Sequence, residues 1–239
     1  MDAAGYTLIA RQSGLAAEMR AIANNIANAE TTGFRREGIV FAEHVRRVAG
    51  GEPSLSIAAA EARTISPVQG ALATTGGPLD LAIEGEGFFL VATPAGERLT
   101  RAGAFALSAA GDLVTQEGHP LLDAGGAPLF VPPGTADLAV AADGTVSAAG
   151  RFLGQVGVVV PADPQGLARE AGTLFAAAGG TLPADDAQVR QGMLERANVA
   201  PIAELTRMIE VQRAYELGQS LADRDHERQR AALETLGRR

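Results

Sequence analysis

Apolar residues near the N-terminus recur at the spacing of an α-helix. They follow one another at steps of seven, four, three and four residues, which places them in one narrow stripe on the helix surface. The stripe consists of Leu8, Leu15, Met19, Ile22 and Ile26. Gln12 interrupts it. A seam this narrow is typical of a helix that pairs with another helix, although a surface helix of an ordinary globular domain has a similar pattern.

A second helical pattern occupies residues 198–239. Asn198 is expected to cap its start, and Pro201 is compatible with a first helical turn. The predicted interface positions on this helix are Ile202, Leu205, Ile209 and Tyr215. Residues 1–33 and 198–239 are therefore predicted to pair in a coiled-coil-like bundle.

The end of the first helix carries a dense polar motif, ANNIANAETTGF. Asn is a poor helix-interior residue but bonds backbone groups well at helix ends, and Gly33 can adopt a positive φ that stops the helix. Phe34 follows this stop and is expected to pack either back on the helix end or on a neighbouring element. The motif residues singled out are Asn24, Asn25, Asn28, Thr32, Gly33 and Phe34.

The middle of the chain has the two-residue alternation of β-strands. Leu79, Leu81 and Ile83 alternate with other residues, and short apolar runs then recur between Gly, Pro and Asp turns. This spacing predicts a central β domain at 72–161, resembling a barrel or sandwich. Residues 34–71 and 162–197 are expected to be extended, partly β linkers. The predicted fold class is α+β, with a β domain between two terminal helices.

The amino-acid composition excludes several kinds of catalytic and covalent chemistry. The 239 residues include no Cys, all basic residues other than the three His are Arg, and those three His are far apart in sequence. Disulfides, thiolate nucleophiles and Schiff-base lysines are thereby excluded. The net charge of −8 is concentrated in residues 51–190, which hold six Arg and fifteen acidic residues. Nucleic-acid binding and membrane insertion are not expected.

Two enzyme hypotheses receive little support from the sequence. Asp80, Glu84 and Glu86 contain the paired carboxylates that glycoside hydrolysis requires, but the alternation places Asp80 and Glu84 toward solvent. The second hypothesis is a catalytic triad of Ser108, His119 and Asp123. It is not supported, because no nucleophile elbow or oxyanion-hole motif accompanies these residues. We therefore expect no catalytic, cofactor or metal site and no enzymatic activity.

Both ends of the chain resemble a known family. The runs LIARQSGL, ANNIANAETTGF and QGMLERANVAPIAELTRMIEVQRAYELGQ are similar to the terminal signatures of the bacterial flagellar axial proteins, which form the rod and hook. The central runs LDLAIEGEGFF, RLTRAGAF and GDLVTQEGHPLL resemble the body of the same proteins. The short length and single small β domain make the chain most similar to the proximal-rod members.

The resemblance implies a structural subunit of the basal-body rod that polymerises through its terminal helices. It implies partners among itself, other rod proteins, junction proteins and the flagellar export apparatus. It also implies a place in the periplasmic rod, reached by type III export without a cleaved signal peptide. A distal-rod or hook subunit remains the alternative, and a periplasmic cell-wall hydrolase is a more distant one.

Overall fold

The computed structural model describes residues 3–46, 55–132, 134–135 and 137–237, and it divides into two compact units. The helical unit comprises Met1–Ala27, Glu37–Thr64 and Ala200–Arg239. The β unit comprises Asn28–Arg36 and Ile65–Val199. Each unit is assembled from segments far apart in the sequence, so each depends on both halves of the chain.

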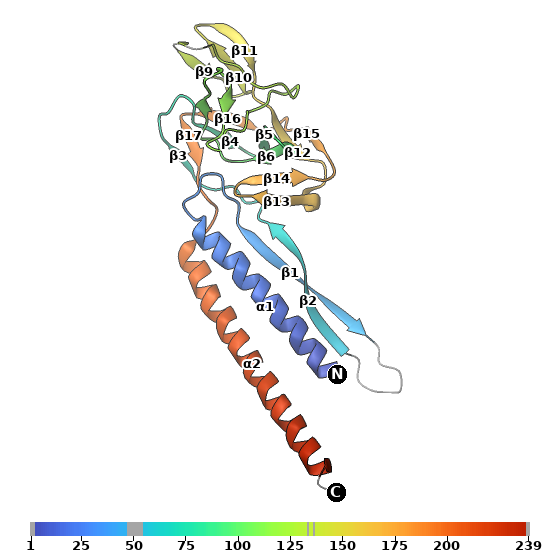
Figure 1. The fold of residues 1–239 in the computed structure, drawn as a ribbon. Coiled ribbons are helices and arrows are strands. Elements are labelled where there is room, and N and C mark those ends of the chain that lie inside the picture. The colour runs from blue at the N-terminus through green and yellow to red at the C-terminus, as the bar shows by residue number, and fades with distance from the viewer. Residues whose placement is uncertain (1–2, 47–54, 133, 136, 238–239) are drawn as a thin grey trace. The chain divides into compact units, whose positions relative to one another are not determined.

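The helical unit contains two long helices and a β ribbon. Helices α1 (Ala3–Ala27) and α2 (Pro201–Gly237) pack along each other, as Figure 1 shows in blue and red. Strands β1 (Glu37–Arg46) and β2 (Leu55–Ile65) form a two-stranded sheet, and β1 contacts α1. The predicted pairing of the terminal helices is thereby confirmed. Among the described residues, no helix is long and apolar enough to cross a membrane.

The seam between the helices is built from small and polar residues as well as apolar ones. Glu204, Val211 and Gly218 recur every seven residues on α2 and are all buried. The Gln12 side-chain amide donates a hydrogen bond to the Tyr215 carbonyl over 3.0 Å. A Cβ at Gly218 would lie 2.2 Å from the Gln12 nitrogen. Gln12, which interrupts the apolar stripe of the sequence, is therefore a seam contact that the glycine makes possible.

A different face of α2 is apolar but exposed. Ile202 is 81% exposed, while Leu205 and Ile209 are each 52% exposed. Their spacing of three and four residues makes them one stripe, separate from the buried positions of the seam. We call this set the outer stripe; its members are Ile202, Leu205, Ile209, Leu217 and Leu221.

The β unit is organised around a six-stranded antiparallel sheet of order β13-β14-β6-β5-β12-β15. Its strands are β5 (Phe88–Thr93), β6 (Gly96–Thr100), β12 (Val158–Pro161), β13 (Leu167–Ala171), β14 (Leu174–Ala177) and β15 (Thr181–Pro183). A short 3-10 helix, η1 (Pro164–Gly166), precedes β13. Both outer strands of this sheet come from the segment that follows β12.

Smaller sheets complete the β unit. A three-stranded sheet has the order β11-β10-β9, and three two-stranded sheets pair β16 with β4, β17 with β3 and β7 with β8. These strands are β3 (Leu72–Thr74), β4 (Leu81–Glu84), β7 (Ala106–Leu107), β8 (Leu113–Val114), β9 (Leu138–Val140), β10 (Thr145–Ala148), β11 (Arg151–Gln155), β16 (Gln188–Gln191) and β17 (Met193–Glu195).

A continuous apolar core fills the β unit. Phe89 is fully buried and meets Phe105 edge to face, with ring centroids 5.3 Å apart. The core also includes Leu81, Ile83, Val91, Leu113, Leu121, Leu129, Val131, Val146, Val156 and Val189. The segment 162–197, expected to be a partly β linker, contributes five strands and also Phe175, which is fully buried in a second cluster. Its apolar residues are few, but most of its strands pair with strands from earlier in the chain.

Candidate functional site

The polar motif that follows the apolar stripe of α1 is divided between the two units. Asn25 belongs to the helical unit, and Gly33, Phe34, Arg35 and Arg36 belong to the β unit. In each unit these residues gather segments that are distant in the sequence. We therefore take the motif and its partners as the candidate site, and describe each unit separately.

Asn25 is the centre of the polar contacts in the helical unit. Its side chain is fully buried, and its amide nitrogen donates to the Glu37 carbonyl at 2.8 Å and to a Glu204 carboxylate oxygen at 3.1 Å. Its amide oxygen accepts from the Glu37 backbone nitrogen at 2.8 Å. An amide is the side chain that offers both donors and an acceptor at one point. Asn25 thus ties α1 to the start of β1 and to the first turn of α2.

Residues 33–36 are held in the β unit by the segment before α2. The Gly33 nitrogen donates to the Glu195 carbonyl at 2.7 Å, and the Asn198 nitrogen donates to the Phe34 carbonyl at 3.2 Å. The Asn198 side chain accepts from the Arg36 nitrogen at 2.5 Å and donates to the Val68 carbonyl at 2.6 Å. The prediction that Asn198 caps the second helix is therefore wrong. The helix begins at Pro201, and Asn198 is engaged by backbone groups of the β unit.

Two buried arginines share one buried glutamate in the same unit. We call Arg35, Glu195 and Arg101 the arginine clamp; the three side chains are at most 3% exposed. Arg35 lies 3.2 Å from one Glu195 carboxylate oxygen, and Arg101 lies 3.1 Å from the other. The glutamate also accepts from the Gly70 nitrogen at 2.9 Å. A single carboxylate therefore joins the motif, the middle of the chain and the segment that leads to α2.

The clamp satisfies most of its polar groups with backbone carbonyls. Arg35 donates to the carbonyls of Pro67, at 2.8 Å, and Val68, while Arg101 donates to those of Ile83 at 3.1 Å and Gly85 at 2.7 Å. Burial lowers the pKa of Arg101 to about 10 and also lowers the pKa of Arg35, and in both cases Glu195 opposes the shift. The charged guanidinium groups thus carry a desolvation cost that the glutamate offsets in part.

Phe34 completes the attachment of the motif. It is 1% exposed, and the Arg169 guanidinium lies 4.3 Å from its ring centroid and 4.7 Å from that of Phe175. A cation–π contact is worth about 0.5–2 kcal/mol, depending on how far the cation is desolvated, and Arg169 is half-buried. The same guanidinium donates to the Arg35 carbonyl. Of the two placements expected for Phe34, packing on another element is the one found.

The remaining motif residues are less central. Asn24, Asn28 and Thr32 are half-buried, and the Asn28 side chain accepts from the Thr31 hydroxyl at 3.2 Å. The predicted interface positions differ in burial: Ile22 is buried, and Leu8, Leu15, Met19, Ile26 and Tyr215 are half-buried. Ile202, Leu205 and Ile209 belong to the exposed outer stripe. Contact of any of these positions with another subunit stays a prediction.

Sequence reasoning missed the partners of the motif. Nothing in the local pattern around Arg35, Arg101 and Glu195 distinguishes them from charged residues at the surface. The one indication is position, since each charge lies inside or beside a family-like run: GFRRE, TRAGAF and LERAN. Arg101 and Glu195 are 94 residues apart, and no local pattern predicts a pair at that separation.

Replacing Gly33 with Ala should strongly destabilise the β unit. Gly33 has a φ of +69°, and a Cβ there would lie 2.2 Å from the Arg101 carbonyl carbon, inside rigid backbone. We expect a loss of about 3 kcal/mol or more, measured by urea unfolding. Gly76→Ala is the matched control, because Gly76 has a φ of +73° and a Cβ there would meet no described atom within 4 Å. A loss of only about 1 kcal/mol is expected there; equal losses in the two variants would contradict the close approach.

Two of the three carboxylates considered for hydrolysis have structural partners. Glu84 pairs with Arg190 at 2.7 Å, and Asp80 accepts from the Thr75 hydroxyl at 2.5 Å. Within the described part of the chain, no three His, Asp or Glu side chains gather in a way that could hold a metal ion. The site is thus a set of contacts that fix the chain ends.

Comparison with known proteins agrees with this structural role. Three family models match: "Flagella basal body rod protein" at residues 5–35, "Flagellar hook protein FlgE/F/G D1 domain" at 82–148 and "Flagellar basal body rod FlgEFG protein C-terminal" at 190–235. The chain is 40% identical to the flagellar basal-body rod protein FlgF of Caulobacter vibrioides, over 100% of this chain and 99% of the relative. It is 35% identical to FlgF of Mesorhizobium japonicum over 97% of both chains. It is 32% identical to FlgG of Bacillus subtilis over 88% of this chain and 90% of that protein.

Paired terminal helices, a β unit that lies between them in the sequence and a polar site that fixes both chain ends define a structural protein of the axial type. The chain belongs to the flagellar basal-body rod protein family. It is a FlgF-like structural subunit of the basal-body rod and not an enzyme, and the rod is its location. The hydrolase hypothesis is therefore dropped. The family also implies assembly with other rod proteins.

Proposed function

We propose that this subunit occupies the proximal part of the rod and joins its neighbours through the terminal helices. The observation that carries the proposal is the outer stripe of α2, a row of exposed Leu and Ile side chains outside the α1 seam. Burying a Leu or Ile side chain is worth about 1.5–3 kcal/mol. A neighbouring helix that covers the outer stripe would gain part of this energy at each position, because these side chains are 52–81% exposed in the single chain.

The proximal position is supported by the extent of similarity. The match to the Caulobacter FlgF extends over nearly the full length of both proteins, whereas the match to the Bacillus FlgG leaves about a tenth of each chain uncovered. A distal-rod or hook subunit is the alternative. It would be favoured if this protein were located beyond the proximal segment.

The mechanism is mechanical. A heterologous contact, in which the outer stripe of one subunit meets a different surface of the next, generates an open helical polymer instead of a closed ring. The terminal helices would form the inner layer of such a polymer and the β units its outer layer. Torque for motility would then pass through many close-packed contacts, which resist deformation collectively.

A photo-crosslinking amino acid at Ile209 tests both the interface and its neighbours. Ile209 is half exposed and belongs to the outer stripe, so the probe should crosslink to a rod protein in purified basal bodies. The same probe at Gln219, an exposed polar position of α2, is the control and should give at least about tenfold less product. Mass spectrometry identifies the partner, and an affinity label seen in images of the basal body gives the position. Equal crosslinking at the two positions would contradict the interface, and a label beyond the proximal rod would favour the alternative.

A further inference from the structure

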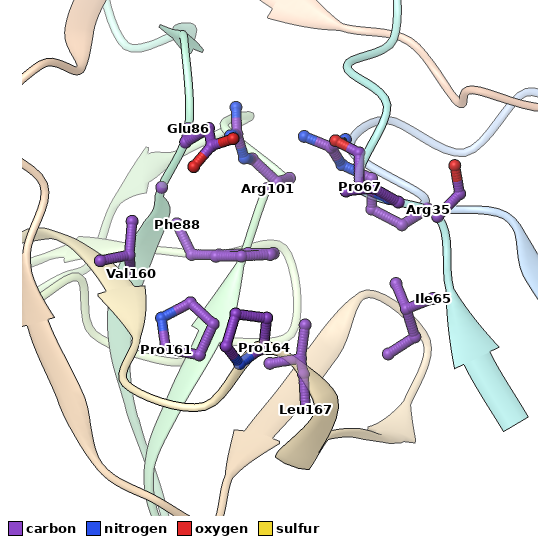
Figure 2. A pocket seen from close by; sticks show the side chains of 12 residues that line it. Arg35, Ile65, Pro67, Glu86, Phe88, Arg101, Val160, Pro161, Pro164 and Leu167 are labelled. Carbon is purple, nitrogen blue, oxygen red and sulfur yellow. The ribbon is translucent and has the colours of Figure 1, made fainter. Parts of the chain in front are cut away.

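A pocket of about 240 Å³ lies beside the arginine clamp in the β unit. Figure 2 shows Arg35, Arg101 and Glu86 along one side of it and a set of apolar side chains along the other. The apolar side is formed by Ile65, Phe88, Val160, Pro161, Pro164 and Leu167. The pocket therefore has one charged wall and one apolar wall.

The charged wall has an excess of positive charge. Within the described part of the chain, Arg35 and Arg101 share only Glu195 as a buried counter-ion, and the Nε atom of each arginine is buried without a hydrogen-bond partner. Glu86 is the remaining acidic group of the wall, and its side chain is exposed. One buried positive charge is thus balanced only by a carboxylate in solvent. A second carboxylate placed in the pocket would be attracted by this charge, because screening is weaker there than at an open surface.

The apolar wall limits what else the ligand can be. A volume of about 240 Å³ is below the range of about 300–1,000 Å³ typical of drug-sized ligands, so it suits one or two side chains and not a helix. Phe88, Leu167 and the two prolines offer contact to an aliphatic or aromatic group. The ligand that satisfies both walls carries a carboxylate next to an apolar group.

We propose that this pocket is a docking site for an acidic residue and its apolar neighbour on an adjacent protein subunit of the rod. This inference rests on the proposed function for the identity of the partner. Charge complementarity supports a partner of this kind, because residues 51–190 of a second copy hold six Arg and fifteen acidic residues. A subunit with this excess of acidic residues presents carboxylates to its neighbours. The arginine clamp offers those carboxylates a local positive charge.

The test uses the purified full-length chain and a minimal peptide, acetyl-Leu-Asp-amide. Its binding is followed by amide chemical shifts in NMR, and the shifts should concentrate at pocket residues such as Gly87 and Leu167. Acetyl-Leu-Asn-amide, which lacks the charge, should bind about tenfold more weakly, because hydrogen bonds and ion pairs to charged groups are the stronger ones. Acetyl-Ser-Asp-amide, which lacks the apolar group, should also bind more weakly.

Two variants lie outside the clamp, and Glu86→Gln, at an exposed position, keeps the test independent of folding. Glu86→Gln removes the exposed competing carboxylate and should tighten peptide binding about fivefold, an effect of the size of one partly screened charge. Leu167→Asp places a negative charge on the apolar wall and should abolish binding. Glu84→Gln is the control, because Glu84 is exposed and does not line the pocket, and it should leave binding unchanged.

Equal binding of the Asp and Asn peptides, or weaker binding to Glu86→Gln, would overturn the inference, as would shifts that fall outside the pocket. A failure of the peptide to bind in this pocket can be distinguished from a failure of the proposed function. Crosslinking from Ile209 reports the helical interface in the other unit, and its result does not depend on this pocket.

Discussion

Replacing Glu195 with Gln should unfold the β unit under conditions in which the wild-type chain is stable. The substitution keeps the size of the side chain but leaves Arg35 and Arg101 buried without a counter-ion. Breaking a buried ion pair by removing one partner costs about 3–5 kcal/mol. That loss is a large part of the total stability of a domain, which is about 5–15 kcal/mol. Hydrogen exchange of the amides in β4 and β5 measures it locally.

The control for this prediction is Glu84→Gln, which removes an ion pair at the surface. Glu84 and Arg190 are 2.7 Å apart, but their side chains are 52% and 45% exposed. Exposed ion pairs contribute about 0–1 kcal/mol, so exchange in β4 and β5 should change little. If Glu195→Gln and Glu84→Gln lost hydrogen-exchange protection equally, burial would not explain how the arginine clamp stabilises the β unit.

The arginine clamp also gives a physical reason for the dense motif at residues 24–36. Residues 33–36 bind Glu195 and Asn198, which precede α2, while Asn25 binds Glu204 in its first turn. In each unit, a segment near the N-terminus is therefore held by a segment near the C-terminus. These contacts join the end of α1 to the first turn of α2 in the helical unit, and they join the segments that follow α1 and precede α2 in the β unit.

Much of the fold follows from local pattern. The helical steps of the two termini predicted α1 and α2 because both helices are long enough for the pattern to repeat. On α2, however, the steps at Ile202, Leu205 and Ile209 mark an exposed stripe and not the side that packs on α1. The alternation of Leu79, Leu81 and Ile83 and the turns that follow predicted a β-rich middle, although Ala82 in β4 is as buried as Leu81 and Ile83. Strand pairing in β13–β17 could not be predicted, because most of the partners lie far earlier in the chain and short strands carry little pattern of their own.

The candidate site was predictable only in part. The Asn-rich run and Gly33 were recognisable, since Asn and Gly have specific uses at helix ends. Burial of Arg35, Arg101 and Glu195 was not, because charged residues are almost never fully buried unless they are paired, and the pairing arises from tertiary structure. Gln12 illustrates the same limit: it interrupts an apolar stripe, yet it occupies the seam because Gly218 leaves room.

Replacing Ile209 with Asp should abolish swimming while the isolated subunit stays folded. Ile209 is 52% exposed in the single chain, so the substitution removes little buried surface and should change the free energy of unfolding by no more than about 0.5 kcal/mol. In the polymer, the same carboxylate would be buried against an apolar neighbour, where an unpaired charge is strongly unfavourable. Rod assembly should therefore fail, as measured by motility in soft agar and by images of isolated basal bodies.

Two other substitutions on α2 separate assembly from folding. Val211→Asp places the charge in the seam, where Val211 is 2% exposed, and should destabilise the helical unit of the isolated chain itself. Gln219→Asp adds the same charge at an exposed polar position and should leave both stability and swimming intact. Normal swimming of the Ile209→Asp strain would show that the outer stripe stays in solvent within the rod. Loss of swimming together with an unfolded subunit would instead place Ile209 among the residues that stabilise the single chain.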